Sequence, residues 1–240
     1  MNTKLIALTL ALTTAAAAQA ASIDFRGQYR TGQERWESRF LLGHELDNGL
    51  GGTIEYTINN SSKAGAGLDD ISWKDTEFQL YYKYKLNDTI TLLPSVLWDS
   101  VKSSNNEVYK VGLQANWAFQ PGWRLDGRVR YEYNNEPSAN LNRQIDNDDW
   151  TRTDITLRNT INKEFDAYYN FRWDHKLSNY AFANGSKNNY EHNIGGGYKI
   201  TKNVRLHGEF GYVGEVQDPN APRGVLTDDW RFRLGATYTF

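Results

Sequence analysis

The segment RLDGRVRYEY, residues 124–133, alternates strictly between two kinds of side chain. Its odd positions form an apolar and aromatic set, interrupted by one glycine: Leu125, Gly127, Val129, Tyr131 and Tyr133. Its even positions are all charged, and three of them are arginines: Arg124, Asp126, Arg128, Arg130 and Glu132. Because successive side chains of a strand point to opposite faces, the segment predicts a strand with one apolar face and one charged face.

The same alternation continues along the chain and predicts about twelve strands. Tyr, Trp, Phe, Val, Ile and Thr are abundant, and the spacing of apolar residues typical of helices is absent. Most of the predicted strands have about the 9–11 residues that cross a bilayer at a tilt. They are 22–31, 36–46, 51–59, 76–86, 90–99, 108–119, 123–134, 151–161, 165–175, 189–200, 204–213 and 229–240.

The connections between these strands alternate in length. Tight turns are predicted at 47–49, 87–89, 120–122, 162–164 and 201–203. Long polar loops are predicted at 60–75, 100–107, 135–150, 176–188 and 214–228, and the first loop, near 32–35, is short. The sequence therefore predicts an all-β, transmembrane antiparallel barrel with short periplasmic turns, long extracellular loops and both termini on the periplasmic side. The alternative is a soluble barrel or sandwich whose core is edged with aromatic residues.

The first twenty residues have the pattern of a cleaved signal peptide. Lys4 precedes the apolar run LIALTLALTTAAAA, and AQA at 18–20 provides small residues for cleavage. We therefore predict a signal peptide at 1–20, a barrel domain at 21–240, and export to the outer membrane of a Gram-negative bacterium. The net charge is only −2, so it indicates no particular partner, and nucleic acid is not expected.

The face opposite to the apolar one carries the charges of the predicted strands. Its sixteen basic residues are Arg26, Arg30, Arg39, Lys83, Lys85, Lys110, Arg124, Arg128, Arg130, Arg152, Arg158, Arg172, Lys199, Arg205, Arg231 and Arg233. Its twelve acidic residues are Asp24, Glu37, Glu45, Glu55, Glu77, Asp126, Glu132, Asp154, Asp166, Asp174, Glu191 and Glu209. No basic residue lies on the apolar face, where it would cost roughly 2–4 kcal/mol at the bilayer midplane. The pattern predicts a watery lumen lined by arginines, which bind carboxylates through paired hydrogen bonds and keep their charge.

Three segments resemble the KdgM-type monomeric porins for acidic oligosaccharides. ASIDFRGQYRTGQERWESRFLLGHELDNGLGGTIEY at 21–56 is similar to the opening hairpin of that family, GRVRYEY at 127–133 to its basic seventh strand, and FRLGATYTF at 232–240 to its last strand. The resemblance implies a narrow monomeric barrel of twelve strands whose arginines conduct oligogalacturonates or sialic acid. With the parity pattern it favours Arg26, Arg30, Arg39, Arg128, Arg130 and Arg233 as substrate-binding residues, followed by Arg124, Arg152, Arg158, Arg172 and Arg231.

Several alternatives stay open at the level of sequence. The twelve acids could pair with the arginines and close the lumen, or the pore could conduct anions or nucleosides with little specificity. Adhesion through the loops is a further alternative, tested by deleting 138–148, and the acidic loop 142–150 could hold divalent cations or lipopolysaccharide. An outer-wall enzyme would need a serine beside His44 or His192; no serine lies within strand reach of His192 in sequence, although cross-strand pairing could supply one. We expect no catalysis, cofactor or metal, and as partners acidic oligosaccharides, outer-membrane lipids with lipopolysaccharide, and the barrel-assembly machinery.

Overall fold

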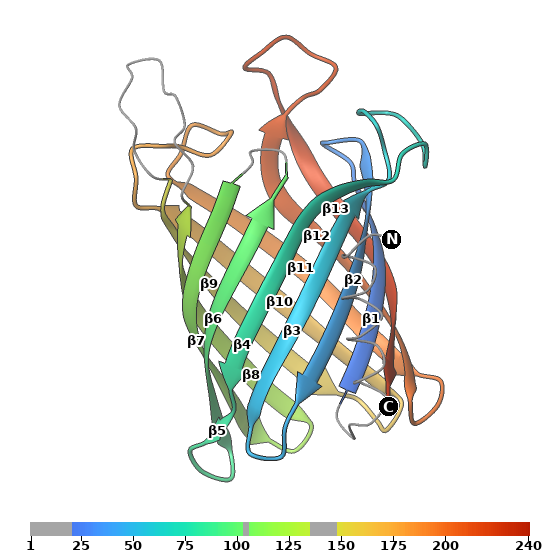
Figure 1. The fold of residues 1–240 in the computed structure, drawn as a ribbon, viewed down its shortest axis with the longest axis vertical. Helices are drawn as coiled ribbons and strands as arrows, with labels where there is room; N and C mark the ends of the chain where they lie inside the picture. The colour runs from blue at the N-terminus through green and yellow to red at the C-terminus, as the bar shows by residue number, and fades with distance from the viewer. Residues whose placement is uncertain (1–20, 103–105, 135–147) are drawn as a thin grey trace, which may run out of the picture.

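The computed structural model describes residues 21–102, 106–134 and 148–240, and these form a closed antiparallel barrel (Figure 1). Consecutive strands pair with each other except β4 and β5, β1 pairs with β13, and the pairing of β4 with β6 completes the closure. The strands are β1 (Ala21–Arg30), β2 (Arg35–Glu45), β3 (Leu50–Asn59), β4 (Ser72–Tyr82), β5 (Tyr84–Lys85), β6 (Ile90–Val101), β7 (Asn106–Gln120), β8 (Trp123–Asn134), β9 (Trp150–Thr160), β10 (Phe165–Lys176), β11 (Asn188–Lys199), β12 (Val204–Gln217) and β13 (Leu226–Thr239).

The two-residue strand β5 continues β4, so that twelve strands form the wall, as predicted. The ladder that β6 forms with β4 and β5 pairs Tyr81 with Ser95 and then Tyr84 with Leu92. It is interrupted between these pairs, at Leu93 and Pro94 of β6. Proline has no backbone N–H to donate, which explains why the ladder breaks there. The all-β transmembrane barrel predicted from the alternation is therefore confirmed. Within the described residues, no helix is long and apolar enough to span a membrane.

Short turns gather at one end of the barrel and longer loops at the other (Figure 1). The chain ends meet at the short-turn end, where Phe240 N donates to Ala21 O at 3.0 Å. The turn at 47–49 needs its glycine, because Gly49 has a φ of 87° and a Cβ there would lie 2.6 Å from Lys83 O. The short turns and the meeting of the chain ends at this end of the barrel agree with the prediction that it is the periplasmic end.

Several strands extend beyond their predicted ends at the long-loop side. β4 begins at Ser72, four residues before the predicted start, and β13 begins at Leu226, three residues before it. β12 continues to Gln217 past an irregularity between Tyr212 and Glu215. These extensions lack the regular apolar alternation of the other strand segments, which hid them in the sequence although their backbones still pair.

The barrel reverses the usual distribution of polar and apolar side chains. Large apolar residues point outward and are exposed, among them Val129 at 56% and Leu234 at 76%. The largest fully buried side chains are polar: Glu132, Asn193 and Asp229. This arrangement suits a protein whose outer surface contacts lipid and whose interior is wet.

Replacing Val129 with arginine is expected to lower the free energy of unfolding by roughly 2–4 kcal/mol, since it exposes a charge to lipid near the middle of β8. Urea unfolding in phospholipid vesicles, followed by tryptophan fluorescence, measures the change. Val129→Ala is the control, because it removes the same apolar contact without adding a charge. Equal losses in the two variants would contradict a lipid-facing position.

Candidate functional site in the barrel lumen

All eleven arginines predicted to bind substrate lie on the inner side of the wall. On β8 the outward residues Val129 and Tyr131 are exposed, whereas Arg130 between them is only 6% exposed. On β13 the outward Trp230 and Phe232 flank Arg231, which is also 6% exposed. The predicted division into a lipid face and a lumen face therefore holds in the structure.

On the wall formed by β8, β9 and β10, two arginines share each of two carboxylates. Asp126 accepts from Arg124 Nη2 at 3.0 Å and from Arg158 Nε at 2.8 Å. Asp154 on β9 binds Arg128 Nη2 of β8 at 2.7 Å. Its other oxygen binds Arg172 of β10 at 2.9 Å. Each carboxylate therefore neutralises only one of the two cations that it holds in place, and the wall stays positive.

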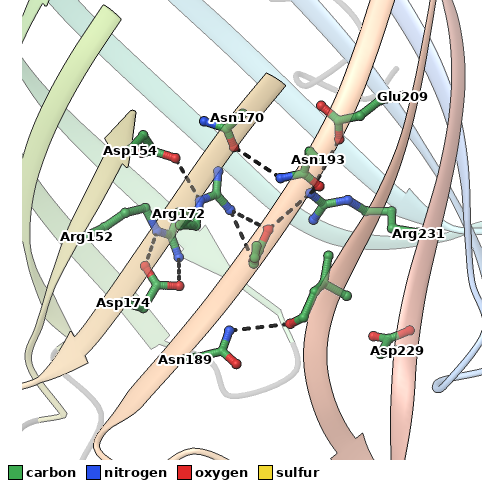
Figure 2. A network of polar contacts seen from close by, with 12 residues as sticks. Arg152, Asp154, Asn170, Arg172, Asp174, Asn189, Asn193, Glu209, Asp229 and Arg231 are labelled. Carbon is green, nitrogen blue, oxygen red and sulfur yellow. Dashed lines mark hydrogen bonds and ion pairs between the residues drawn. The ribbon is translucent and has the colours of Figure 1, made fainter. Parts of the chain in front are cut away.

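The pattern of shared partners continues toward the long-loop end. Glu132 binds Arg130 at 2.7 Å and Arg152 at 3.4 Å, and Arg152 also binds Asp174 at 2.7 Å. Figure 2 shows Arg152 joined to the carboxylate of Asp174, and beside this pair Arg172 joined to Asp154. The side chain of Glu132 is 2% exposed, so this arrangement packs charge against charge inside the wall.

A second basic group lies on β12, β13, β1 and β2. Arg231 donates through Nη2 to Asn193 at 2.9 Å and to Glu191 at 3.1 Å (Figure 2), and Arg233 binds Glu209 at 2.7 Å. Three further pairs join the strands: Arg30 of β1 binds Asp229 of β13, and Arg39 of β2 binds Asp24 at 2.5 Å and Glu55 at 3.0 Å. Together with the wall of β8–β10, this group places arginines on opposite sides of the lumen.

Three lumen carboxylates were missed in the sequence because they lie at predicted strand ends or outside them. Asp75 belongs to the extended part of β4, Asp229 is the first residue of the last predicted strand, and Asp99 ends a segment that is apolar on both faces. On β3, β4 and β6 the acids form a separate strip, in which Lys110 of β7 binds Glu77 and Asp99 and Arg39 binds Glu55. The strip consists of Glu55, Asp75, Glu77 and Asp99. The signs are thus separated on the lumen wall, which the sequence did not determine.

A cavity of about 380 Å³ lies in the middle of the lumen. Six arginines line it against four carboxylates: Arg26, Arg39, Arg128, Arg158, Arg172 and Arg205 against Asp24, Asp126, Asp154 and Glu209. A second cavity of about 770 Å³ lies at the short-turn end, and Arg158 and Arg205 line both. A basic path therefore connects the centre of the lumen with its short-turn end.

The residues considered for other functions have local contacts. His192 points outward, and Tyr169 Oη lies 2.7 Å from its Nδ1. In the described part of the acidic loop, Asp148 pairs with Lys176 and Asp149 accepts from Tyr131 Oη at 2.8 Å, while 142–147 lie outside the described residues. No group of three or more His, Cys, Asp or Glu side chains suits a metal ion in the part of the chain that the structure describes.

The chain is similar over most of its length to known outer-membrane channels. It is 26% identical over 224 residues to the N-acetylneuraminic acid outer membrane channel protein NanC of Escherichia coli strain K12, covering 92% of this chain and 90% of that one. It is 24% identical over 247 residues to the oligogalacturonate-specific porin KdgM of Dickeya dadantii, covering both chains completely. These relatives are channels and not enzymes.

Solved structures share the fold. The NanC porin matches with a TM-score of 0.78 at 20% identity, covering 91% of this chain and all of that one. The KdgM porin in complex with disordered oligogalacturonate matches with a TM-score of 0.66 at 20% identity, covering 91% and 99%. The model of the oligogalacturonate-specific porin protein family (KdgM) matches residues 14–240. With its closed twelve-stranded barrel and arginine-lined lumen, the chain therefore belongs to the KdgM family of outer-membrane porins.

Proposed function

We propose that the chain conducts acidic oligosaccharides passively through the outer membrane, with oligogalacturonates as its cargo. The supporting observation is the central cavity, where six arginines stand against four carboxylates while the acidic strip lies elsewhere on the wall. Such a separation attracts carboxylates to one path through a lumen whose total charge is nearly balanced. The names of the relatives support an acidic sugar but differ on which one.

The shared salt bridges suit conduction better than tight binding. An arginine already bound to a wall carboxylate, such as Arg128 or Arg158, keeps further donors for a passing anion. Its contact with that anion is weakened by the wall carboxylate, and conduction requires several moderate sites and not one deep one. The arginines between β8 and β10 thus form a series of exchangeable partners.

The length of the basic path favours an oligosaccharide over a single sugar. Arg158 and Arg205 line both the central cavity and the larger cavity at the short-turn end. A chain of uronic acids carries a carboxylate on every unit and can contact several of these arginines at once. A monosaccharide acid contacts fewer of them, so we expect it to bind less tightly by loss of multivalency.

Single-channel recording of the refolded chain in planar bilayers tests the proposal. In a KCl gradient we expect a reversal potential that indicates anion preference, and then block by trigalacturonate at lower concentrations than by N-acetylneuraminic acid, with no block by maltotriose. Block by N-acetylneuraminic acid alone would reassign the cargo. Folded protein without conductance would mean that the salt bridges close the lumen.

Replacing Arg128 and Arg130 together with alanine is expected to lower the anion/cation permeability ratio about two- to fivefold, because two positive charges leave the wall within one Debye length of the path. Reversal potentials measure the ratio. The matched control is Lys83→Ala with Lys85→Ala, which removes the same charge from half-exposed or exposed side chains at the short-turn end. An unchanged ratio in the arginine variant would remove both arginines from the mechanism.

We further propose that residues 1–20, outside the described residues, are removed on export and that the barrel functions as a monomer embedded in lipid and lipopolysaccharide. The mass of the protein purified from outer membranes should then correspond to a chain that begins at Ala21. Chemical cross-linking in those membranes should yield no specific dimer or trimer.

A further inference from the structure

Arg26 differs from the other ten predicted arginines in its surroundings. Within the described residues, each of those ten binds at least one carboxylate, whereas Arg26 has no hydrogen-bond or ion-pair partner. Its Nε atom is buried and has no acceptor; the same holds for Nε of Arg39 and Arg231, but those two residues bind carboxylates through Nη2. A buried donor without an acceptor is unfavourable, so this position calls for an explanation.

The strands beside Arg26 leave it without an acceptor. Its direct neighbours across the sheet are Arg39 on β2, which carries the same charge, and Gly235 on β13, which has no side chain. Asp24, two residues earlier on the same face, accepts three hydrogen bonds and none from Arg26: one oxygen accepts from Arg39 at 2.5 Å, and the other from His207 Nε2 and Thr237 Oγ1, each at 2.7 Å.

The remaining carboxylates around this position are also occupied. Glu55 accepts from Arg39 Nη1 at 3.0 Å. Glu209 accepts from Arg233 Nη1 and from Tyr168 Oη, each at 2.7 Å. Arg26 therefore lines the cavity, while Asp24, Glu55 and Glu209 each accept hydrogen bonds from other residues.

We infer that Arg26 forms a subsite for one carboxylate of the cargo and makes the strongest single contact with it, whereas the paired arginines make weaker, exchangeable contacts and supply the surrounding positive potential. A guanidinium presents a planar fork that matches a carboxylate, and Arg26 has no wall acid to give up when the cargo arrives. This inference rests on the proposed function and adds the residue that determines affinity.

The opposite wall is suited to hold the same sugar. In the strand order, β8 lies diametrically opposite β1, with five strands between them on either side once β5 is counted with β4. On that side the cavity is lined by Arg128 of β8 and Arg158 of β9, each of which already binds its own wall carboxylate. A sugar acid bound to Arg26 would therefore lie in a positive potential from both sides, with its strongest contact on β1.

The test compares Arg26→Gln with Arg158→Gln in single-channel recordings with trigalacturonate. Both variants remove one positive charge from the same cavity, and in the second Asp126 keeps Arg124 as its partner. We expect the blocking constant to rise about tenfold in Arg26→Gln and less than threefold in Arg158→Gln, while reversal potentials shift similarly in both. Equal rises, or none in Arg26→Gln, would overturn the inference.

Arg26→Lys provides a second measurement should the glutamine variant fail to fold. Lysine keeps the charge without the planar fork, so anion preference should stay near that of the original protein while the blocking constant still rises severalfold. An unchanged blocking constant in this variant contradicts the subsite. Block of the unaltered protein is recorded first: if no acidic sugar blocks it, the proposed function itself fails, which is a different outcome from an ineffective Arg26 substitution.

Discussion

Asp229→Ala is expected to lower the free energy of unfolding of the barrel by about 3 kcal/mol. Asp229 is 0% exposed on β13, where it accepts from Arg30 Nε of β1 at 2.7 Å and from the amide of Gly32 at 3.0 Å. Alanine would leave both donors without this acceptor at the seam between the first and last strands. The loss of stability is expected at the lower end of the range for broken buried ion pairs, because Arg30 keeps 21% of its side chain exposed and can be partly rehydrated.

The neighbouring carboxylate provides the control for this stability measurement. Asp228 is exposed and accepts from Tyr212 Oη at 3.2 Å. Asp228→Ala should change the free energy of unfolding by less than about 0.5 kcal/mol, as is usual at exposed positions. Urea unfolding in vesicles compares the two variants. Similar losses would show that burial of the Asp229 pair does not stabilise the seam.

Asp154→Asn is expected to raise the anion/cation permeability ratio roughly three- to tenfold at 0.1 M salt. Asp154 holds Arg128 Nη2 at 2.7 Å and Arg172 Nε at 2.9 Å, and all three side chains line the central cavity. Asparagine keeps the size of the side chain and one acceptor oxygen but removes the negative charge. The cavity gains one unit of positive charge, and two guanidinium groups are released from a common carboxylate.

The electrostatic origin of this gain can be tested in two ways. Glu45→Gln causes the same change in total charge at a site outside the central cavity, where Glu45 pairs with Lys83 at 2.9 Å, and it should change the ratio less than twofold. In 1 M salt, where the Debye length falls to about 3 Å, the effect of Asp154→Asn should largely disappear. A gain that persists in 1 M salt would point to a change in pore shape.

The parity of the strands was readable in the sequence because it depends on local geometry alone. Side chains of a strand alternate every residue, so Val129 and Arg128 must face opposite sides wherever the strand lies. Lipid and water on the two sides of the wall then make the alternation visible over nearly the whole chain. At the strand ends this contrast is lost: Asp75 lies on a part of β4 outside the predicted strand, and Asp229 is the first residue of the last predicted strand, so neither was assigned to the lumen face.

The pairing of charges could not be predicted, since it depends on the register between strands. A shift by one residue on β9 would carry Asp154 to the lipid face, and a shift by two would move it away from Arg128. The isolation of Arg26 likewise arises because Arg39 and Gly235 fall opposite it. The sequence by itself determined a barrel with its arginines inside, because alternation is a property of each strand. Only the tertiary structure decided, within the described residues, which of the eleven predicted arginines share a carboxylate and which one of them has none, because stagger around the closed sheet brings together residues that are remote in the chain.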